Sequence, residues 1–287
     1  MTTTAIALPR PRRMWRQVRR RWLGALGLVV TAIVVLAAVL APWLAPYDPN
    51  RQSLGDALEP PRAGHWLGND ELGRDVLSRV LYGGRVSLLI GIGSVVAGLM
   101  VGAPLGIVAG YRGGWADSLI MRGVEVPLVF SGFLMAVWVL AILGQGVVNV
   151  VIALGLRSLP IFARIARNTT LSLRERTYVE AAIAAGSGEL AILRRHILPN
   201  LVSPLLVVAT LRTGAAILLA ASLSFLGLGV PPQIPEWGTM IKNGMAYLRT
   251  GAHHLVLAPG LAIMAAVLGL NLLGDDLRDA WDPRQRD

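Results

Sequence analysis

Long apolar runs dominate the pattern of hydrophobic and polar positions along this chain. A helix that crosses a lipid bilayer needs about 20 mostly apolar residues, and six stretches reach that length. They cover residues 22–44, 86–110, 117–143, 147–166, 201–227 and 255–274. The pattern therefore predicts an all-α polytopic membrane protein with six transmembrane helices, because only helices satisfy their own backbone within lipid in this arrangement.

The arginines that flank these runs predict how the chain is threaded. Seven of them precede the first run, namely Arg10, Arg12, Arg13, Arg16, Arg19, Arg20 and Arg21. By the positive-inside rule this end is cytoplasmic. An alternative is a cleaved N-terminal signal, which would leave five spans, although the first run is long for such a signal.

Threading from a cytoplasmic N-terminus gives a layout in five parts. We expect a basic tail at 1–21, the first transmembrane helix at 22–44 and an extracytoplasmic segment at 45–85. A core at 86–274 holds the other five spans, and 275–287 forms a second cytoplasmic tail. Both termini are thus predicted to be cytoplasmic.

Composition agrees with a membrane protein. Hydrophobic residues make up 54% of the 287-residue chain and charged residues only 15%, against about 25% charged in soluble domains. The net charge of +10 would suggest nucleic acid in a soluble protein. Here the basic residues gather beside apolar runs, as the positive-inside rule describes for membrane proteins, so we expect no nucleic-acid partner.

Signatures of catalysis are missing from the sequence. A P-loop requires a lysine followed by serine or threonine, whereas the only lysine, Lys242, precedes Asn243. The chain has no cysteine and its four histidines form no His-x-x-x-His pair, so we expect no metal site. We predict a protein with no catalytic residue and no cofactor of its own.

A stripe of small residues marks the predicted span at 86–110. Its members recur every four residues and are Ser94, Gly98, Gly102, Gly106 and Gly110. Small residues let membrane helices approach closely, so the stripe indicates either ordinary helix packing or a position near a pore axis. Pro104 lies within the stripe and is expected to kink the helix.

Between two spans, the cytoplasmic segment 171–200 has a helix–turn–helix pattern. Ser172 and Glu175 fit a capping box that would begin a helix. Glycine accepts left-handed turns, so Gly186 should end that helix, and a second helix at 189–196 should end before Pro199. The apolar face of the first helix consists of Val179, Ala182, Ile183 and Gly186. Such a face suits either a connector lying on the lipid surface or a lever that docks into a partner protein.

The spacing of residues in this segment carries a resemblance to a known family. Glu180-Ala181-Ala182, Gly186 and Leu198-Pro199 resemble the EAA signature of ABC-importer permeases. His196 departs from the isoleucine common in such permeases, and its surroundings resemble the dipeptide/oligopeptide/nickel branch. Residues 65–76, 224–229 and 271–275 also resemble motifs of that branch, and the chain is most similar to its C-type subunit.

The resemblance implies the ABC type I importer permease fold and a function. Such a chain would form half of a translocation channel in the bacterial inner membrane, importing di- or oligopeptides, nickel chelates or haem-like solutes. Its implied partners are a second homologous permease, two cytoplasmic ATPase subunits that use ATP and Mg, and an extracytoplasmic solute-binding protein. The implied ATPase-coupling residues are Glu180, Ala181, Ala182, Gly186, Ser187, Arg194, Arg195, Leu198 and Pro199.

Arg212 lies in the middle of the predicted span at 201–227. A charge there costs about 2.5–3.5 kcal/mol on insertion scales, so it should face a cavity or a partner. The family commonly has a glutamate where this chain has Ala220, so this helix lacks that acid and carries a base at Arg212. Arg212 either meets an anionic group of the solute or pairs with an acid on the partner permease. With Ser222 and Ser224 it makes up the predicted translocation pathway.

Two expectations stay open from the sequence. The segment 45–85 should form short surface helices that receive the binding protein, or else a plain solvated loop. A self-contained channel or secondary carrier, or a membrane scaffold, is the rival class. Secondary carriers often contain inverted repeats, and no such internal symmetry is apparent.

Overall fold

The computed structural model describes the backbone of residues 11–281 and the side chains of residues 22–280. The seven N-terminal arginines and the ends of both predicted tails therefore lie outside the side chains described. Within residues 11–281 the chain forms helices and two isolated β-bridges but no strand. The long helices are α1 (Pro11–Val39), α3 (Val76–Arg112), α6 (Val147–Arg174), α9 (Leu198–Phe225) and α11 (His254–Trp281). The shorter ones are α2 (Ala41–Leu44), α4 (Gly114–Glu125), α5 (Gly132–Leu143), α7 (Thr177–Ala184), α8 (Glu189–Ile192) and α10 (Trp237–Met245).

Within residues 11–281, five helices are long and apolar enough to cross a membrane, and a bent pair makes a sixth span if its two helices are counted together. The pair consists of Gly114–Val129 and Gly132–Leu143, which meet at 89°. Pro127 lies at the break, in a 3₁₀ turn at Val126–Val129 that ends in extended backbone at Phe130. Proline has no N–H to donate, so the helix cannot continue regularly there. The prediction of an all-α polytopic protein is confirmed, but its third span is broken.

Several predicted boundaries differ from the helices observed. The run at 22–44 is divided, because α1 ends at Val39 and α2 follows. Helix α3 begins at Val76, well before the predicted residue 86, because the Asp75 carboxylate accepts a 2.8 Å hydrogen bond from the backbone N–H of Ser78 and caps the helix. Helix α11 continues past residue 274 into the segment expected to be a tail.

The small-residue stripe of α3 packs against α6. A Cβ added to Gly98 would lie 2.9 Å from the carbonyl oxygen of Gly155, and one on Gly110 would lie 2.6 Å from that of Arg167. The glycines between them face the intervening carbonyls of α6 in the same way. This close approach confirms the packing interpretation, and α3 remains a continuous helix through Pro104.

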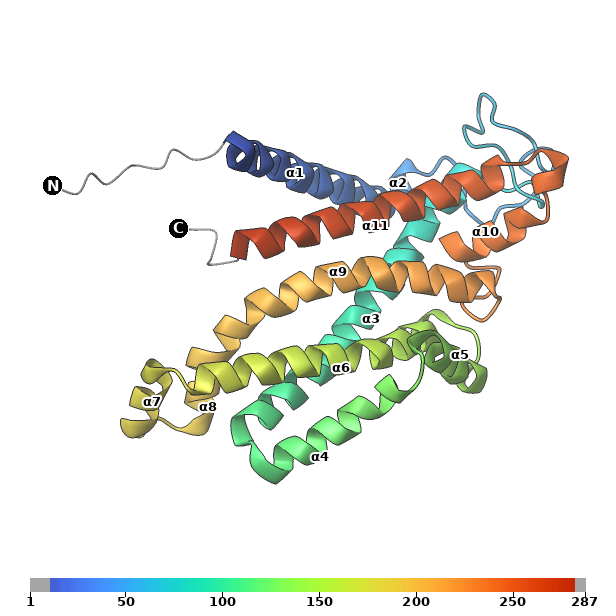
Figure 1. Ribbon diagram of the computed structural model, residues 1–287. Helices are drawn as coiled ribbons and strands as arrows, with labels where there is room; N and C mark the ends of the chain where they lie inside the picture. Colours follow the sequence, from blue (N-terminus) through green and yellow to red (C-terminus); the bar gives the residue numbers. More distant parts are fainter. Residues whose placement is uncertain (1–10, 282–287) are drawn as a thin grey trace.

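The two ends of the bundle carry different structures (Figure 1). The start of α1, the end of α11 and the short helices α7 and α8 lie at one end. The segment at 45–75, α2 and α10 lie at the other end. This arrangement agrees with the predicted threading, in which segment 171–200 shares a side with both termini.

Candidate functional site: the helical hairpin between two spans

The hairpin begins later than the capping-box pattern predicts. Helix α6 continues to Arg174, so Ser172 lies inside it and caps nothing. The break comes at Arg176, whose extended backbone (φ −84°, ψ 137°) precedes α7. The predicted helix start at Ser172 is therefore wrong, because the residues around it continue a helix that is already formed.

Gly186 ends α7 in the way that the sequence predicts. Its φ is +77°, a left-handed conformation that suits glycine. Its N–H donates to the carbonyl of Ile183 at 2.9 Å, and the N–H of Ser187 donates to that of Ala182 at 3.1 Å. These two bonds form a Schellman motif, which turns the chain sharply towards α8.

The second arm of the hairpin does not end before Pro199. Helix α8 passes through a π-helical turn, Leu193–Ile197, directly into α9. The wider turn carries the chain past Pro199, which lacks an N–H and would crowd the carbonyl four residues earlier in a regular helix. The predicted short helix at 189–196 is thus the first part of a continuous rod from Glu189 to Phe225.

The inner face of the hairpin anchors it to the spans. Val179, Ile192 and Ile197 are fully or almost fully buried and belong to one core cluster with Phe162 of α6. Val179 therefore points inward, although the sequence grouped it with Ile183, which is 48% exposed. Ile192 and Ile197 escaped notice because their five-residue spacing is that of a π-turn and not of an α-helix.

The outer face of the hairpin is open. Of the residues predicted to couple to an ATPase, only Ala182 is half-buried. The exposed ones are Glu180, Ala181, Gly186, Ser187, Arg194, Arg195, Leu198 and Pro199. The structure therefore brings the whole predicted set together on one accessible projection.

Polar and aromatic contacts brace the hairpin against neighbouring helix ends. Glu189 lies 3.9 Å from the guanidinium of Arg112, at the end of α3. The rings of Tyr178 and His196 lie 5.8 Å apart and join the two arms. These contacts connect α7, α8 and the start of α9 to one another and to the end of α3.

The three predicted pathway residues of α9 have different surroundings. Arg212 is half-buried. Ser222 is half-buried and lines an open apolar hollow of about 450 Å³ together with Phe133 and Phe225. Ser224 is only 2% exposed and lies against Gly229 in the turn that ends α9, so in this subunit it presents no surface to a solute.

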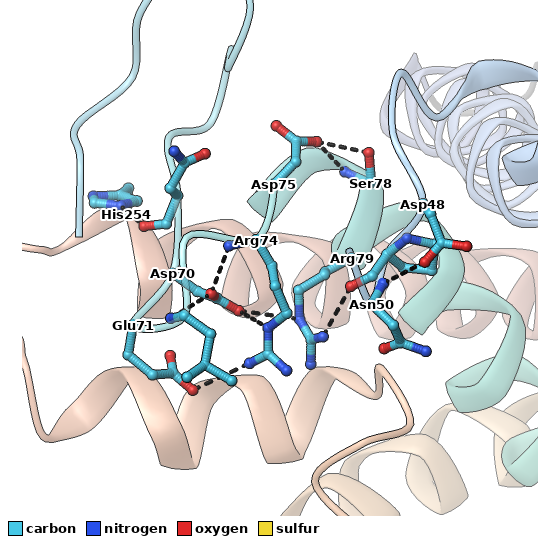
Figure 2. A network of polar contacts seen from close by, with 12 residues as sticks. Asp48, Asn50, Asp70, Glu71, Arg74, Asp75, Ser78, Arg79 and His254 are labelled. Atoms are coloured by element: carbon cyan, nitrogen blue, oxygen red, sulfur yellow. Dashed lines mark hydrogen bonds and ion pairs between the residues drawn. The ribbon is translucent and has the colours of Figure 1, made fainter. Parts of the chain in front are cut away.

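At the opposite end of the bundle, the segment at 45–75 is folded around a charged network (Figure 2). The Asp70 carboxylate accepts a hydrogen bond from Arg74 Nε at 2.6 Å and lies 3.5 Å from Arg79 Nε. Arg79 also donates to the carbonyl of Pro49 at 3.0 Å. All three charged side chains are buried, and buried charges require such pairing.

Further contacts fix this segment to the spans. His65 Nδ1 lies 2.9 Å from Asp75, the residue that caps α3, and its ring stacks on that of Tyr47. The ring of His254, at the start of α11, lies 3.2 Å from the carbonyl of Asn69. The expected surface helices are absent between residues 45 and 75, yet the segment is no plain solvated loop. It is a hydrogen-bonded cap on the ends of α3 and α11.

A bundle of spanning helices with an exposed hairpin at one end and a folded cap at the other defines a membrane subunit of a transport complex. The profile of a family described as "Binding-protein-dependent transport system inner membrane component" matches residues 102–287. A second profile, the "N-terminal TM domain of oligopeptide transport permease C", matches residues 11–61. The chain belongs to this family of binding-protein-dependent inner-membrane permeases.

Individual relatives agree with this assignment. The glutathione transport system permease protein GsiD of Pectobacterium atrosepticum is 47% identical over 276 residues, covering 94% of this chain and 91% of that protein. GsiD of Escherichia coli O6:K15:H31 is 45% identical over 271 residues, covering 94% and 89%. Among solved structures, an inward-facing MetNI methionine ABC transporter matches with a TM-score of 0.56 and 19% identity, covering 70% of this chain and 95% of that one. At that identity the likeness supports the fold alone.

Membership settles the coarse function. The chain is a multi-pass inner-membrane permease of an ABC importer and a transport subunit instead of an enzyme. The resemblance to the C-type subunit of the dipeptide/oligopeptide branch is confirmed. Such a permease works with a solute-binding protein and with ATPase subunits.

Proposed function

We propose that this chain pairs with a second, homologous permease to form the channel of an importer for small peptides, glutathione among them. The N-terminal profile match and the names of the relatives support this solute class, since that profile is of an oligopeptide permease and the relatives are glutathione permeases. Nickel chelates and haem-like solutes, which the resemblance also allows, have no such support.

The observation that carries the mechanism is the hairpin that is anchored on one face and open on the other. We propose that its exposed face, centred on Gly186, docks into a cytoplasmic ATPase subunit. The rod from Glu189 to Phe225 is continuous, so a displacement at the hairpin reaches the middle of the bundle along α9. Rigid-body movement of this kind is a common way to switch between two states. The start of α1 and the end of α11 share the hairpin's end of the bundle, so both termini are proposed to be cytoplasmic.

Two neighbouring glycines provide a matched test of this coupling. No atom outside the local chain lies within 4 Å of a Cβ placed on Gly186 or on Gly188, but only Gly186 has a positive φ. Valine at a left-handed position costs roughly 1–2 kcal/mol or more, so Gly186→Val should distort the turn. Gly188 has φ −66° and ψ 152°, which valine adopts readily, so Gly188→Val serves as the control.

The assay is uptake of labelled glutathione by the assembled transporter in proteoliposomes. Gly186→Val should reach the membrane in normal amounts and lose most ATP-dependent uptake, while Gly188→Val retains it. Uptake by Gly186→Val at the wild-type rate would refute the coupling role. A labelled dipeptide and a nickel complex, supplied in parallel, test the solute class, and uptake of the nickel complex alone would contradict peptide import.

A further inference from the structure

Helix α6 presents a row of arginines to the broken span. Arg167 makes two hydrogen bonds, through Nε and one terminal nitrogen, to the two carboxylate oxygens of Asp117 in α4, each 2.5 Å long. Three residues before Arg167 in the same helix, Arg164 donates to Glu125 at 2.9 Å. This face of α6 thus holds carboxylates with guanidinium groups, and the pair of Arg167 and Asp117 has the forked geometry that suits both ions.

Arg157 continues the row to the break itself. It lies on the same face of α6, seven residues before Arg164, which is two helical turns. Among the residues that the structure describes, no carboxylate pairs with it. The residue opposite is Gly132, the first residue of α5, and the Arg157 side chain occupies the space that a Cβ on Gly132 would need.

A second arginine approaches the first from another helix. Arg212 lies on α9, which packs against α6, and the charge of Arg157 acts on it. Both residues are half-buried, and neither forms a hydrogen bond or an ion pair with any residue that the structure describes. By contrast, Arg174, the fourth arginine of α6, donates to the carbonyl of Tyr111 at 2.8 Å.

Two guanidinium groups close together inside a membrane span repel each other unless an anion lies between them. Ionisable residues within spans usually line the path of a solute or pair with one another. Arginine in particular offers a planar fork of donors that matches a carboxylate. The two unpaired arginines therefore have the chemistry of a carboxylate site, at the point where the span is interrupted.

We propose that Arg157 and Arg212 form a carboxylate-binding site on the translocation path, which favours peptides with free carboxylates over neutral ones. Gly132 is part of the site, because any side chain there would displace Arg157. The proposal rests on the peptide-import function proposed above and refines it: glutathione, which has two carboxylates, is a suitable solute. The sequence singled out Arg212 alone, and the structure adds Arg157 as a second specificity residue.

The test compares two solutes in the complete transporter with its binding protein. The probes are glutathione and its analogue with the glycine carboxylate amidated, each first shown to load the binding protein. Uptake is divided by the loaded fraction of that protein. Wild-type transporter should favour glutathione at least about tenfold, the discrimination expected from hydrogen bonds to a charged group.

Arg157→Gln and Arg212→Gln should each reduce this preference to near unity while uptake of the amide stays unchanged. Arg157→Lys should retain part of it. Arg122→Gln is the matched control, because Arg122 is an exposed arginine of the same broken span and should leave both uptake rates unchanged.

Three results would overturn the site. An unchanged preference in both glutamine variants would show that these arginines do not select the solute. Equal loss of both probes, together with loss of the partner permease on co-purification, would show that they pair with an acid of that partner. If the wild-type transporter takes up neither probe, peptide import itself is refuted, and the site with it. This third result can be told apart from the first two, in which wild-type uptake is normal.

Discussion

Gly106 of α3 lies directly against the carbonyl group of Ala163 in α6. Any side chain there would collide with backbone, which cannot move aside as a flexible side chain can. We expect Gly106→Val to separate the two helices and to lower the free energy of unfolding by about 1–3 kcal/mol or more, the cost of overpacking. Thermal unfolding of the purified protein in detergent would show this as a lower Tm.

Gly123 of α4 supplies the control for that change. No atom outside the local helix lies within 4 Å of a Cβ placed on it, so Gly123→Val should alter Tm little. If both variants lost stability equally, the close approach of α3 and α6 would be incorrect.

At this scale the sequence predicted what depends on residue type and missed what depends on neighbours. The stripe of α3 was recognisable because small residues at four-residue spacing have few other uses in a span. Arg212 stood out as a charge within an apolar run, whereas Arg157 carried the same signal in the run 147–166 and was overlooked. Ser172 and Glu175 matched a capping box, but nothing local revealed that α6 continues through them.

Among the elements, the broken span depends on α6 for its position. Asp117 binds Arg167 through a half-buried pair whose side chains are 16% and 29% exposed. Glu125 and Arg164 form a second pair whose side chains are 44% and 52% exposed. The half-buried pair should therefore hold α4 in place more strongly than the exposed one.

Exchanging the charges tests this arrangement. Arg167→Asp places two carboxylates together and should cost about 1–3 kcal/mol of stability, seen as a lower Tm and yield. The double variant Asp117→Arg/Arg167→Asp should recover most of that loss. The same exchange at Glu125 and Arg164 should change Tm only slightly, and an equally large effect there would contradict the ranking of the two pairs.

The break in this span was beyond the reach of hydropathy. Residues 117–143 are apolar enough to cross a membrane, and hydrophobicity is the same for a straight helix and one bent by 89°. Pro127 was the only local hint. The π-turn before Pro199 was hidden for the same reason, since its five-residue spacing resembles neither a helix nor a strand.

The whole molecule was the most predictable level. Apolar run lengths gave the number of spans, and motif spacing gave the family, because both are properties of the linear chain. The cap at 45–75 could not be foreseen, since its structure depends on pairs such as Asp70 with Arg79 that form only when the segment folds onto α3. The hairpin lies at the same end as the start of α1 and the end of α11, as expected when four predicted spans precede it and two follow it.

The account rests on contact between the hairpin and a cytoplasmic ATPase subunit, and site-directed cross-linking tests that contact directly. The chain has no cysteine, so one introduced thiol is unique. Ser187→Cys places it on the exposed hairpin, and Gln52→Cys places it at the opposite end of the bundle. In the assembled transporter, a maleimide carrying a photoreactive benzophenone is attached to the introduced thiol, and irradiation should join the Ser187→Cys variant to the ATPase subunit and leave the Gln52→Cys variant unjoined. Labelling of Ser187→Cys by a membrane-impermeant maleimide in intact spheroplasts, without cross-linking to the ATPase, would contradict the account.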